Sequence, residues 1–558
     1  MNNNISEIKD LNFFFATDGD KNPKSEMFAT IEAFFSNEKK DDNSSICRFP
    51  ARYQWLKDKL NGVDFPKANC IEYNKVFKHV DPQSATLVFP SAHINSPASM
   101  FGHTFIRINS SYNSKLLSYA INYAANADKS KENGVVFAIK GLTGGYLGKY
   151  SLLPYYDKLK EYRDSEQRDI WEYDLNLTRS ETRRMFRHIW ELNNIQTNYY
   201  FFTQNCSYEM LWLLEVARPS IELRKEFTFQ VIPFETVHEA KKAGLIKSMS
   251  YRPSKRAKLL KYETLINKKF IEYPILLVDG TMYVKDIMQN KDIPIEQKRY
   301  ILEASIEYLE YSFSKSKVKK KYYLELFHKL TTNRAKLGLG EKIEIKTPPN
   351  PIQSHKAVRT TFGIGSRENN FISYLGIRPA YHDLEDSNYG FLRGTQIEFL
   401  NFMFSYSKEK LEVEDATILS IFSLAQRDDF FHNISWRTSI GWDRDYLSTD
   451  ATFHTSVGAG SSWGNELGFV YMMVDPSFYN TNEKVEASIG GSVGFTIDKY
   501  KFMNTKVEAT QKKYTNGEEQ TLIEATQGFR TSQNRQIMLK YKYKKDEQNF
   551  QILFHYYF

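Results

Sequence analysis

Hydrophobic and polar residues alternate most regularly in the last third of the chain. From residue 354 to Phe558 there are about twelve alternating segments of roughly ten residues, separated by polar or glycine-containing turns. In the last segment, aromatic or aliphatic residues occupy every second position: Phe550, Ile552, Phe554, Tyr556 and Phe558. Segments of this length and period predict a closed antiparallel β-barrel of about twelve strands.

The composition favours a barrel in a membrane over a soluble β-sandwich, which is the alternative for such a pattern. Aromatic residues make up 15% of the chain, and the inward positions are often Ser, Thr, Gly, Lys or Glu. The terminal Phe558 also resembles the end of the last strand in bacterial outer-membrane barrels. No apolar run approaches the roughly 18 residues that a membrane-spanning helix needs, so an anchor of that kind is not expected.

The chain before the barrel shows helical patterns mixed with short strand-like runs. Thr104–Asn109 and Lys115–Ala124 are typical of strands, and Thr178–Asn193 is typical of an amphipathic helix. Paired prolines in Lys346–Gln353 mark a boundary before the alternating segments. We therefore expect an α+β protein with four parts: an N-terminal helical region (1–82), an α+β domain (83–250), a basic helical linker (251–353) and the barrel (354–558).

Charge and targeting features narrow the function and location only slightly. The net charge is +8, a small excess for 558 residues, so nucleic-acid binding is not expected. The basic run Lys315–Lys321 is typical of a solvated helix face or linker, and a contact with anionic lipid headgroups is the alternative. The N-terminal sequence MNNNISEIKDLNFFF lacks the basic and then apolar stretch of a secretory signal. The protein is therefore either cytosolic or represented without the signal that exports it.

Three cysteines are present, an odd number for any disulfide scheme. Cys47 and Cys70 form either a bridge, in an oxidising compartment, or two ordinary buried thiols. Cys206 is left over. It follows Asn205, a good N-cap, at the start of a helical pattern, so we expect its thiol in the first turn of a helix.

A thiol at a helix N-terminus is favoured as the thiolate by the helix dipole, by about 0.3–1 kcal/mol. A nucleophile at neutral pH needs more than this, and an adjacent histidine supplies it. His103 is the candidate, because it opens a predicted strand and follows Gly102, which allows another segment to approach closely. His93 is a competitor, but it lies in a loop-like context. From spacing alone, structural roles for such residues are the more common case.

Neither a metal nor a cofactor site is predicted. The sequence contains no HExxH motif and no CxxC pair. The glycine-rich segment Gly141–Gly148 lacks the Lys and Ser/Thr of a P-loop, and a loop lining a cleft or a plain turn explains it better.

Two longer segments carry a family resemblance. They are Phe89–Asn109 (FPSAHINSPASMFGHTFIRIN) and Tyr199–Pro219 (YYFFTQNCSYEMLWLLEVARP). Over about residues 45–250 the chain resembles the Lnb N-terminal periplasmic domain family, with further similarity in Cys47–Leu56, Leu117–Ala125, Lys140–Gly148 and Glu166–Asp174. This family looks like a circularly permuted relative of the papain-like NlpC superfamily, and its name comes from a lipoprotein intramolecular transacylase.

The resemblance implies acyl chemistry at a thiol. Cys206 would be the nucleophile, His103 the general base, and the backbone N–H of Cys206 part of an oxyanion hole. Asn122 is the first candidate for the group that orients His103, and Ser99 is the second. The expected protein is a periplasm-facing acyltransferase or hydrolase in the outer membrane, acting on a lipid or lipoprotein substrate without a cofactor. A cysteine peptidase or amidase for cell-wall peptide, or a non-enzymatic envelope protein that binds a partner, are the alternatives.

Overall fold

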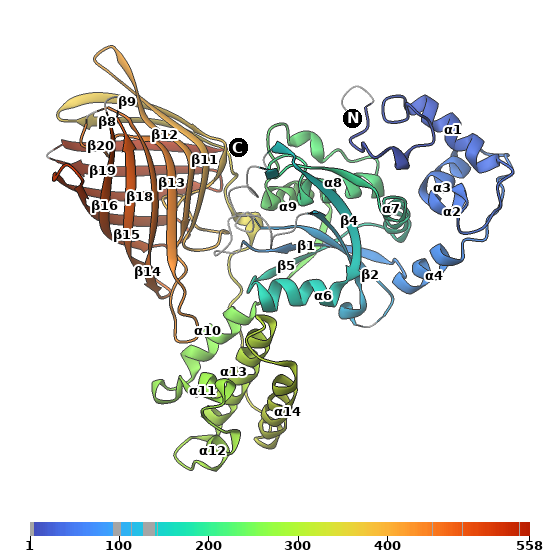
Figure 1. Ribbon diagram of the computed structural model, residues 1–558, viewed down its shortest axis with the longest axis horizontal. Helices are drawn as coiled ribbons and strands as arrows, with labels where there is room; N and C mark the ends of the chain where they lie inside the picture. Colours follow the sequence, from blue (N-terminus) through green and yellow to red (C-terminus); the bar gives the residue numbers. More distant parts are fainter. Residues whose placement is uncertain are drawn as a thin grey trace. The chain divides into compact units, whose positions relative to one another are not determined.

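The computed structural model describes residues 5–92, 102–112, 114–126, 140–141, 143–448, 450–481, 484–545 and 547–558. These residues divide into two compact units (Figure 1). The first unit extends to Ser254, and the second spans Lys255–Phe558. The first combines helices with a sheet and the second combines helices with a barrel, so the predicted α+β class is confirmed.

A seven-stranded sheet, counted over the described residues, is the framework of the first unit. Its strand order is β6-β4-β3-β2-β1-β5-β7, and every neighbouring pair is antiparallel. Val88, Phe105 and Ile106 on the central strands are fully buried, so the sheet carries the core of this unit. The strands are β1 (Ser84–Pro90), β2 (Phe105–Asn109), β3 (Tyr119–Ala125), β4 (Tyr146–Pro154), β5 (Ile170–Leu175), β6 (Gln196–Tyr199) and β7 (Ile246–Arg252).

The two strands predicted around the candidate histidine are adjacent in this sheet. The predicted strand Thr104–Asn109 is β2, and it pairs with β3 through Ile106 and Ile121. The strand predicted at Lys115–Ala124 is wrong at its start, because Lys115–Leu117 forms a 3-10 turn. The Ser118 N–H donates to the Lys115 carbonyl and closes that turn, so β3 begins only at Tyr119.

Helices of the first unit begin and end near the predicted boundaries. The helix predicted at Thr178–Asn193 is α7, which begins with a capping box of Thr178 and Glu181. Cys47 and Cys70 form a disulfide between α2 and the start of α4, which decides between the two alternatives for this pair. The helices are α1 (Pro23–Phe35), α2 (Ser45–Arg48), α3 (Pro50–Lys59), α4 (Ile71–Val80), α6 (Tyr155–Leu159), α7 (Arg179–Glu191), α8 (Cys206–Ala217) and α9 (Pro233–Lys242).

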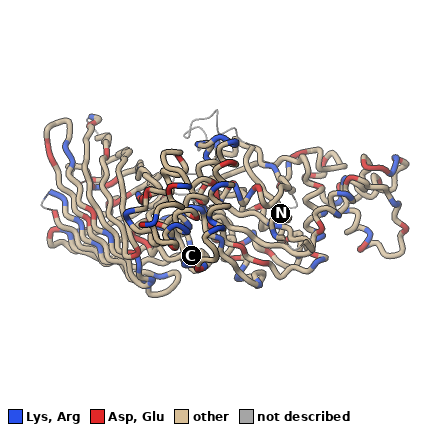
Figure 2. The backbone as a smooth tube through the Cα atoms, turned by 90° about the horizontal axis from the view of Figure 1, so that it is seen from below, with Lys and Arg blue, Asp and Glu red and all other residues tan. Residues whose placement is uncertain are grey.

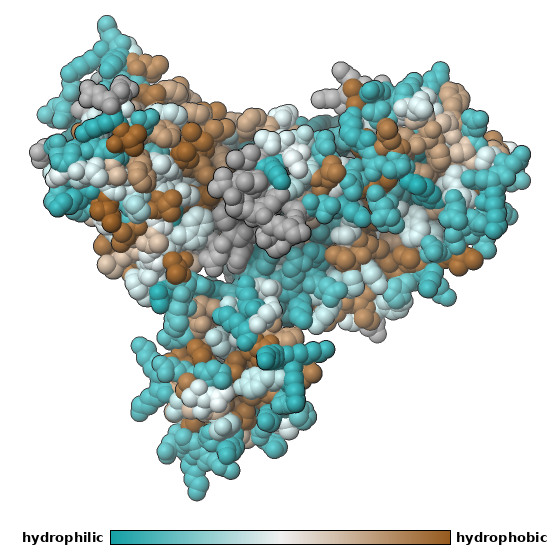
Figure 3. Space-filling model, viewed as in Figure 1, coloured by the Kyte–Doolittle hydropathy of each residue, from teal (hydrophilic) through white to brown (hydrophobic). Residues whose placement is uncertain are grey.

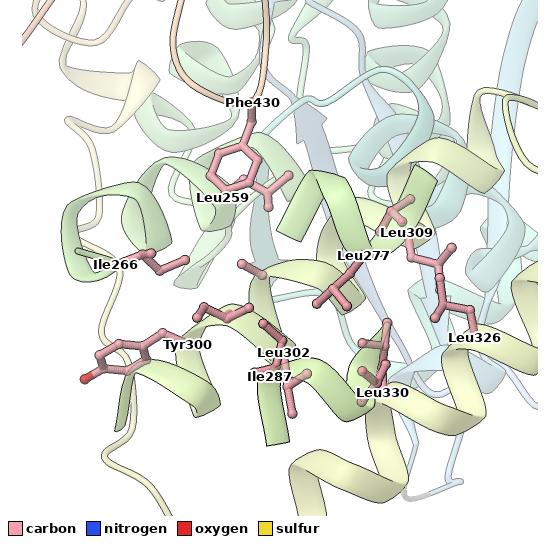
Figure 4. Close-up of a cluster of buried hydrophobic side chains, with 14 of the residues drawn as sticks. Leu259, Ile266, Leu277, Ile287, Tyr300, Leu302, Leu309, Leu326, Leu330 and Phe430 are labelled. Atoms are coloured by element: carbon pink, nitrogen blue, oxygen red, sulfur yellow. The ribbon is translucent and has the colours of Figure 1, made fainter. Parts of the chain in front are cut away.

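The helices of the second unit pack around a hydrophobic core of their own (Figure 4). Leu259, Leu277 and Leu330 from three helices belong to this core, and so does Phe430 from the connection between β12 and β13. Asp428 in the same connection forms an ion pair with Arg256, at 2.8 Å. The connection therefore ties the helices to the barrel strands. The helices are α10 (Lys255–Leu265), α11 (Tyr273–Asp279), α12 (Val284–Gln289), α13 (Ile295–Ser314) and α14 (Lys320–Lys336).

A barrel of twelve strands, among the residues described, forms the rest of this unit (Figure 1). Pairing runs without interruption from β11 to β20, then from β20 to β8 and β9, and the pairing of β9 with β11 closes the ring. The short strand β10 (Ala380–His382) pairs with β11 besides. The predicted closed barrel is confirmed. Its strands are β8 (Arg359–Arg367), β9 (Asn370–Arg378), β11 (Thr395–Ser407), β12 (Lys410–Ser423), β13 (Ser435–Asp443), β14 (Thr452–Gly464), β15 (Gly468–Asn480), β16 (Val485–Ile497), β17 (Met503–Tyr514), β18 (Glu519–Ser532), β19 (Arg535–Lys544) and β20 (Glu547–Tyr557).

The two faces of the barrel wall differ in chemistry as the alternation predicts. On β20, Phe550, Ile552 and Phe554 are exposed, whereas Gln551 and His555 are buried on the inner face. Figure 3 shows hydrophobic residues on the outer surface of the barrel. An apolar outer face and a polar interior are the arrangement of a barrel that spans a membrane.

Charged residues of both signs line the interior of the barrel. Arg437 pairs with Glu508 at 2.8 Å, and Lys540 pairs with Glu385 and Glu524 at 3.0 and 3.2 Å. In Figure 2, Lys and Arg are interspersed with Asp and Glu along the strands. A cavity of about 290 Å³ is lined by side chains that include Lys540, Glu385 and Glu524.

Candidate active site

The candidate nucleophile lies where the sequence predicted it, at the first residue of a helix. Cys206 begins α8, and Asn205 caps it by accepting hydrogen bonds from the backbone N–H groups of Ser207 and Tyr208, at 3.0 and 3.2 Å. The Asn205 side chain also donates to the backbone carbonyls of Phe201 and Val231, at 2.9 and 2.7 Å. These bonds fix the position of the helix start against two other segments of the chain.

Thr104 connects this helix start to the strand that carries the candidate base. Its hydroxyl donates to the Ser207 hydroxyl at 2.6 Å, and both side chains are fully buried. Its backbone N–H acts on the Cys206 sulfur and lowers the pKa of the thiol. Because Thr104 directly follows His103, the sulfur lies near the peptide group that joins the two residues. The residues singled out as nucleophile and base, about one hundred positions apart in the chain, are therefore brought into one site.

His103 is oriented by Asn122, the first candidate for that role. The His103 Nε2 atom lies 3.0 Å from the Asn122 Oδ1 atom. Because a carbonyl oxygen only accepts, the Nε2 atom carries the proton in this pair. Asn122 lies on β3, which pairs with β2 immediately beyond His103, so the sheet register brings the two side chains together.

The turn that leads into His103 requires a glycine. Gly102 has a φ of +87°, and a Cβ atom there would lie 2.7 Å from the Phe89 ring. The His103 N–H donates to the Pro90 carbonyl at 3.4 Å, which holds the turn against the end of β1. The alternative candidates Ser99 and His93 lie outside the described residues.

Aromatic rings that the sequence analysis did not single out surround the two candidate residues. The Tyr162 ring lies 5.7 Å from the His103 ring and is buried beside the Arg168 guanidinium. Burial raises the pKa of Tyr199 well above the ordinary value, and the nearby backbone of Cys206 lowers it in part. Tyr199 lies in the same segment as Cys206, but only the folded chain shows that its hydroxyl lies near the start of α8.

The environment of the thiol differs from the expectation based on the helix dipole. Cys206 is 4% exposed, and this burial raises the pKa of its thiol. Hydrogen bonds from Thr104 and Ser207, and the charge of Arg168, lower the pKa only in part. The dipole contributes less than a full desolvation penalty, so the expected resting thiolate is not favoured in this structure. The start of a helix can be predicted from a sequence. The burial of the thiol, which opposes the effect of the helix dipole on its pKa, cannot.

Residues 72–243 match the family model of the Lnb N-terminal periplasmic domain. The resemblance drawn from the sequence is thus confirmed, and this range is called the Lnb-like domain below. It contains His103, Asn122 and Cys206 together with the sheet that positions them. Three further families match the rest of the chain, each described as a domain of unknown function: DUF7843 at 1–59, DUF7842 at 249–344 and DUF7840 at 348–557.

Solved structures of porins align with part of the chain. A KdgM porin in complex with disordered oligogalacturonate shares 9% identity, with 36% of this chain and 99% of that chain covered and a TM-score of 0.24. A NanC porin has 9% identity, 36% and 100% coverage and a TM-score of 0.25. A loop-deletion mutant of OmpT, an outer membrane protein of Vibrio cholerae, has 8% identity, 36% and 97% coverage and a TM-score of 0.21. A search of curated proteins gave no match.

These findings confirm the predicted location. The Lnb-like domain matches the model of a family of periplasmic domains, and the barrel has an apolar outer face. The protein is an outer-membrane protein with a periplasmic domain.

Among the described residues, no helix has the length and apolar character to cross a membrane.

Proposed function

We propose that the Lnb-like domain is a thiol acyltransferase or hydrolase, with Cys206 as the nucleophile and His103 as the general base. The observation that carries the proposal is the pair of hydrogen bonds made by His103 and by Thr104, which follows it. Asn122 lies 3.0 Å from the Nε2 atom of His103, and the Thr104 hydroxyl donates to Ser207, the neighbour of Cys206, at 2.6 Å. A nucleophile, a base and a group that orients the base are the parts that covalent catalysis requires.

In the first half-reaction the Cys206 thiol gives its proton to His103 Nδ1, and the sulfur forms a bond to the carbonyl carbon of an acyl ester. The carbon–oxygen bond to the leaving alcohol then breaks, and the alcohol takes the proton from His103. The product is a thioester on Cys206. In the second half-reaction an amine or a water molecule attacks the thioester, loses its proton through His103, and the sulfur leaves.

A high thiol pKa is compatible with this sequence of steps. The thiol stays neutral until a substrate is in place, and proton transfer to His103 accompanies the attack. The Thr104 N–H lowers the pKa of the Cys206 thiol, so it stabilises negative charge that develops on the sulfur. The Cys206 N–H at the start of α8 is the group that we assign to the oxyanion hole.

The membrane barrel in the same chain supports a lipid or lipoprotein acyl group as the substrate class. A barrel in the outer membrane keeps the domain of the same chain near acyl chains, which raises their effective concentration at the site. Aromatic side chains such as Tyr162 and Phe105 line the base, and they favour an apolar substrate segment there. Cell-wall peptide amides are the competing substrate class.

The test uses the full chain in detergent micelles, incubated separately with diacylated lipopeptide, phospholipid and peptidoglycan fragments. We expect lysolipid or N-acylated lipopeptide by mass spectrometry, and an acyl adduct on Cys206 when the reaction is quenched early. Released stem peptide would instead assign the site to the peptidase class. If none of the substrates is converted and no adduct forms, the non-enzymatic alternative stands.

A further inference from the structure

A second cluster of chemically active side chains lies in the second unit, at one end of the barrel. It contains His355, which precedes β8, His382, which ends β10, and Asp386, which follows β10. All three side chains are at most 2% exposed. One ligand atom from each lies within 4.8 Å of the others.

The proton positions on both imidazole rings follow from their outer neighbours. His355 Nδ1 lies 2.6 Å from the Lys356 carbonyl oxygen, which can only accept, so Nδ1 carries a proton. His382 Nε2 lies 3.2 Å from Asn388 Oδ1. The amide orientation of Asn388 is set in turn, because its Nδ2 donates to the Asp498 carboxylate at 3.1 Å. His382 Nε2 therefore also carries a proton.

The remaining ring nitrogens point at one another. His355 Nε2 lies 3.2 Å from His382 Nδ1, and these atoms lie 3.7 and 3.8 Å from the same oxygen of Asp386, Oδ2. Two neutral rings with their outer nitrogens protonated present lone pairs to each other across this gap. A cation between them removes the repulsion. The Asp386 Oδ2 atom lies beside this gap and also accepts hydrogen bonds from Arg378 at 2.6 Å and from the Asp383 N–H at 3.2 Å.

These separations match the coordination of a transition metal. Ligand atoms bound at about 2.0–2.1 Å in a tetrahedral shell lie about 3.3 Å apart. Two imidazoles and a carboxylate are ligands that zinc and similar divalent metals accept. The outer hydrogen bonds to a carbonyl and an amide oxygen are the second layer that metal-binding histidines require.

The net charge of the groups around the cluster is compatible with a bound cation. Arg378 and Arg359 bind Asp386 at 2.6 and 3.0 Å, and both also bind Asp383, at 2.8 and 2.7 Å. Glu398 lies 3.4 Å from Arg378 and adds a third carboxylate to the two guanidinium groups. A divalent cation therefore enters a cluster that is not already positive.

We propose that His355, His382 and Asp386 form a binding site for one divalent transition-metal ion, with zinc as the expected occupant. A water molecule completes the coordination. Each imidazole ring stacks on an aromatic ring, with a distance between ring centres of 4.0 Å for His355 and Tyr557 and 4.1 Å for His382 and Phe391. The ion links the segment before the first barrel strand, β10 and the residues that follow it, so its role is structural.

The site has no sequence motif, because its ligands are spaced 27 and 4 residues apart in three different segments. The search for HExxH and CxxC could not find it. The antiparallel pairing of β8 with β9, in which Arg359 lies opposite Arg378, brings the segments of His355 and His382 together.

The test measures metal on the full chain in detergent, stripped with a chelator, dialysed, loaded with zinc chloride and desalted. We expect one zinc per chain by mass spectrometry. With cobalt(II) in its place, we expect visible absorption bands of a tetrahedral site. His355→Gln and His382→Gln should each reduce the bound metal to background.

His454→Gln is the matched control, because His454 is also buried in the barrel wall and lies 3.1 Å from a carboxylate oxygen of Asp443. It should retain the full metal load. Folding of every variant is checked by the migration of unheated samples in SDS. If the stripped wild-type chain binds neither zinc nor cobalt, the proposal fails. Equal loss in His454→Gln and His382→Gln would overturn it too.

Discussion

Two histidines in different regions of this protein are oriented by the same device. In the Lnb-like domain, Asn122 accepts from His103 Nε2 at 3.0 Å, and in the barrel unit, Asn388 lies 3.2 Å from His382 Nε2. In both cases the amide oxygen fixes the proton on Nε2 and leaves Nδ1 as the reactive atom. The surroundings of the two rings differ: the residue after His103 acts on a thiol, whereas a second imidazole and a carboxylate lie beside His382. The orientation of an imidazole therefore does not by itself decide its chemistry, and the groups around the ring have to be considered too.

The largest expected effect is on acyl transfer by the Lnb-like domain, and it should leave metal binding in the barrel unit unchanged. Cys206→Ser should lower acyl transfer by at least about 10³-fold, because the hydroxyl is a far weaker nucleophile without a strong base. The same variant should keep the metal load of the wild-type chain. Product formation by mass spectrometry and metal content, measured on one preparation, check both statements.

His103→Gln should have a comparable effect on transfer, and His79→Gln is its matched control. His79 is an exposed histidine in the last turn of α4. Unchanged transfer in His103→Gln would remove the base from the mechanism, whereas equal losses in both variants would point to instability instead.

Removal of the Asn122 amide should have an intermediate effect on acyl transfer by the Lnb-like domain. Asn122→Ala should lower kcat by about 10- to 100-fold with little change in KM, because the ring loses its preferred tautomer and orientation. Asn122→Asp keeps the acceptor and should restore part of the activity. It should also move the acid limb of the pH–rate profile to higher pH, since a carboxylate favours the protonated ring. A purely structural role for Asn122 predicts no such movement.

The matching change in the barrel is Asn388→Ala. Loss of a bond to the outer nitrogen of a metal-binding histidine typically weakens metal affinity by about 10- to 100-fold. We expect that range for zinc, measured by competition with a chelating dye. Affinity that equals the wild-type value would show that Asn388 does not orient a ligand.

Sequence reasoning was most successful where one period or one short motif carries the information. The alternation of Phe550, Ile552 and Phe554 predicted the barrel wall, and Asn205 predicted the start of α8. Asn122 was also named, because strand neighbours bring residues together in a regular way, although register itself cannot be derived from one sequence. The burial of Cys206 depends on packing from many segments and was not visible in the sequence.

The remaining features depend on pairing and packing that the sequence alone does not give. Burial raises the pKa of Tyr199, and this burial depends on how β6 and α8 pack in the folded domain. The site of His355 and His382 depends on the register of β8 with β9, in which Arg359 lies opposite Arg378. Register of this kind cannot be derived from one sequence.

The smallest expected effect concerns the reactivity of the resting thiol. The helix position of Cys206 predicts rapid alkylation near neutral pH, faster than that of Cys47 or Cys70. Burial raises the pKa of this thiol, so we expect a slow reaction with iodoacetamide at pH 7 that accelerates into the alkaline range. Cys47 and Cys70 are joined as a disulfide and should react only after reduction, so unfolded protein is the better reference for Cys206. A rate that levels off below neutral pH would show instead that His103 and the helix dipole outweigh burial and hold a thiolate at rest. The Lnb-like domain would then carry a charged pair of residues before any substrate binds, and the contrast with the two neutral rings of the barrel site would become sharper.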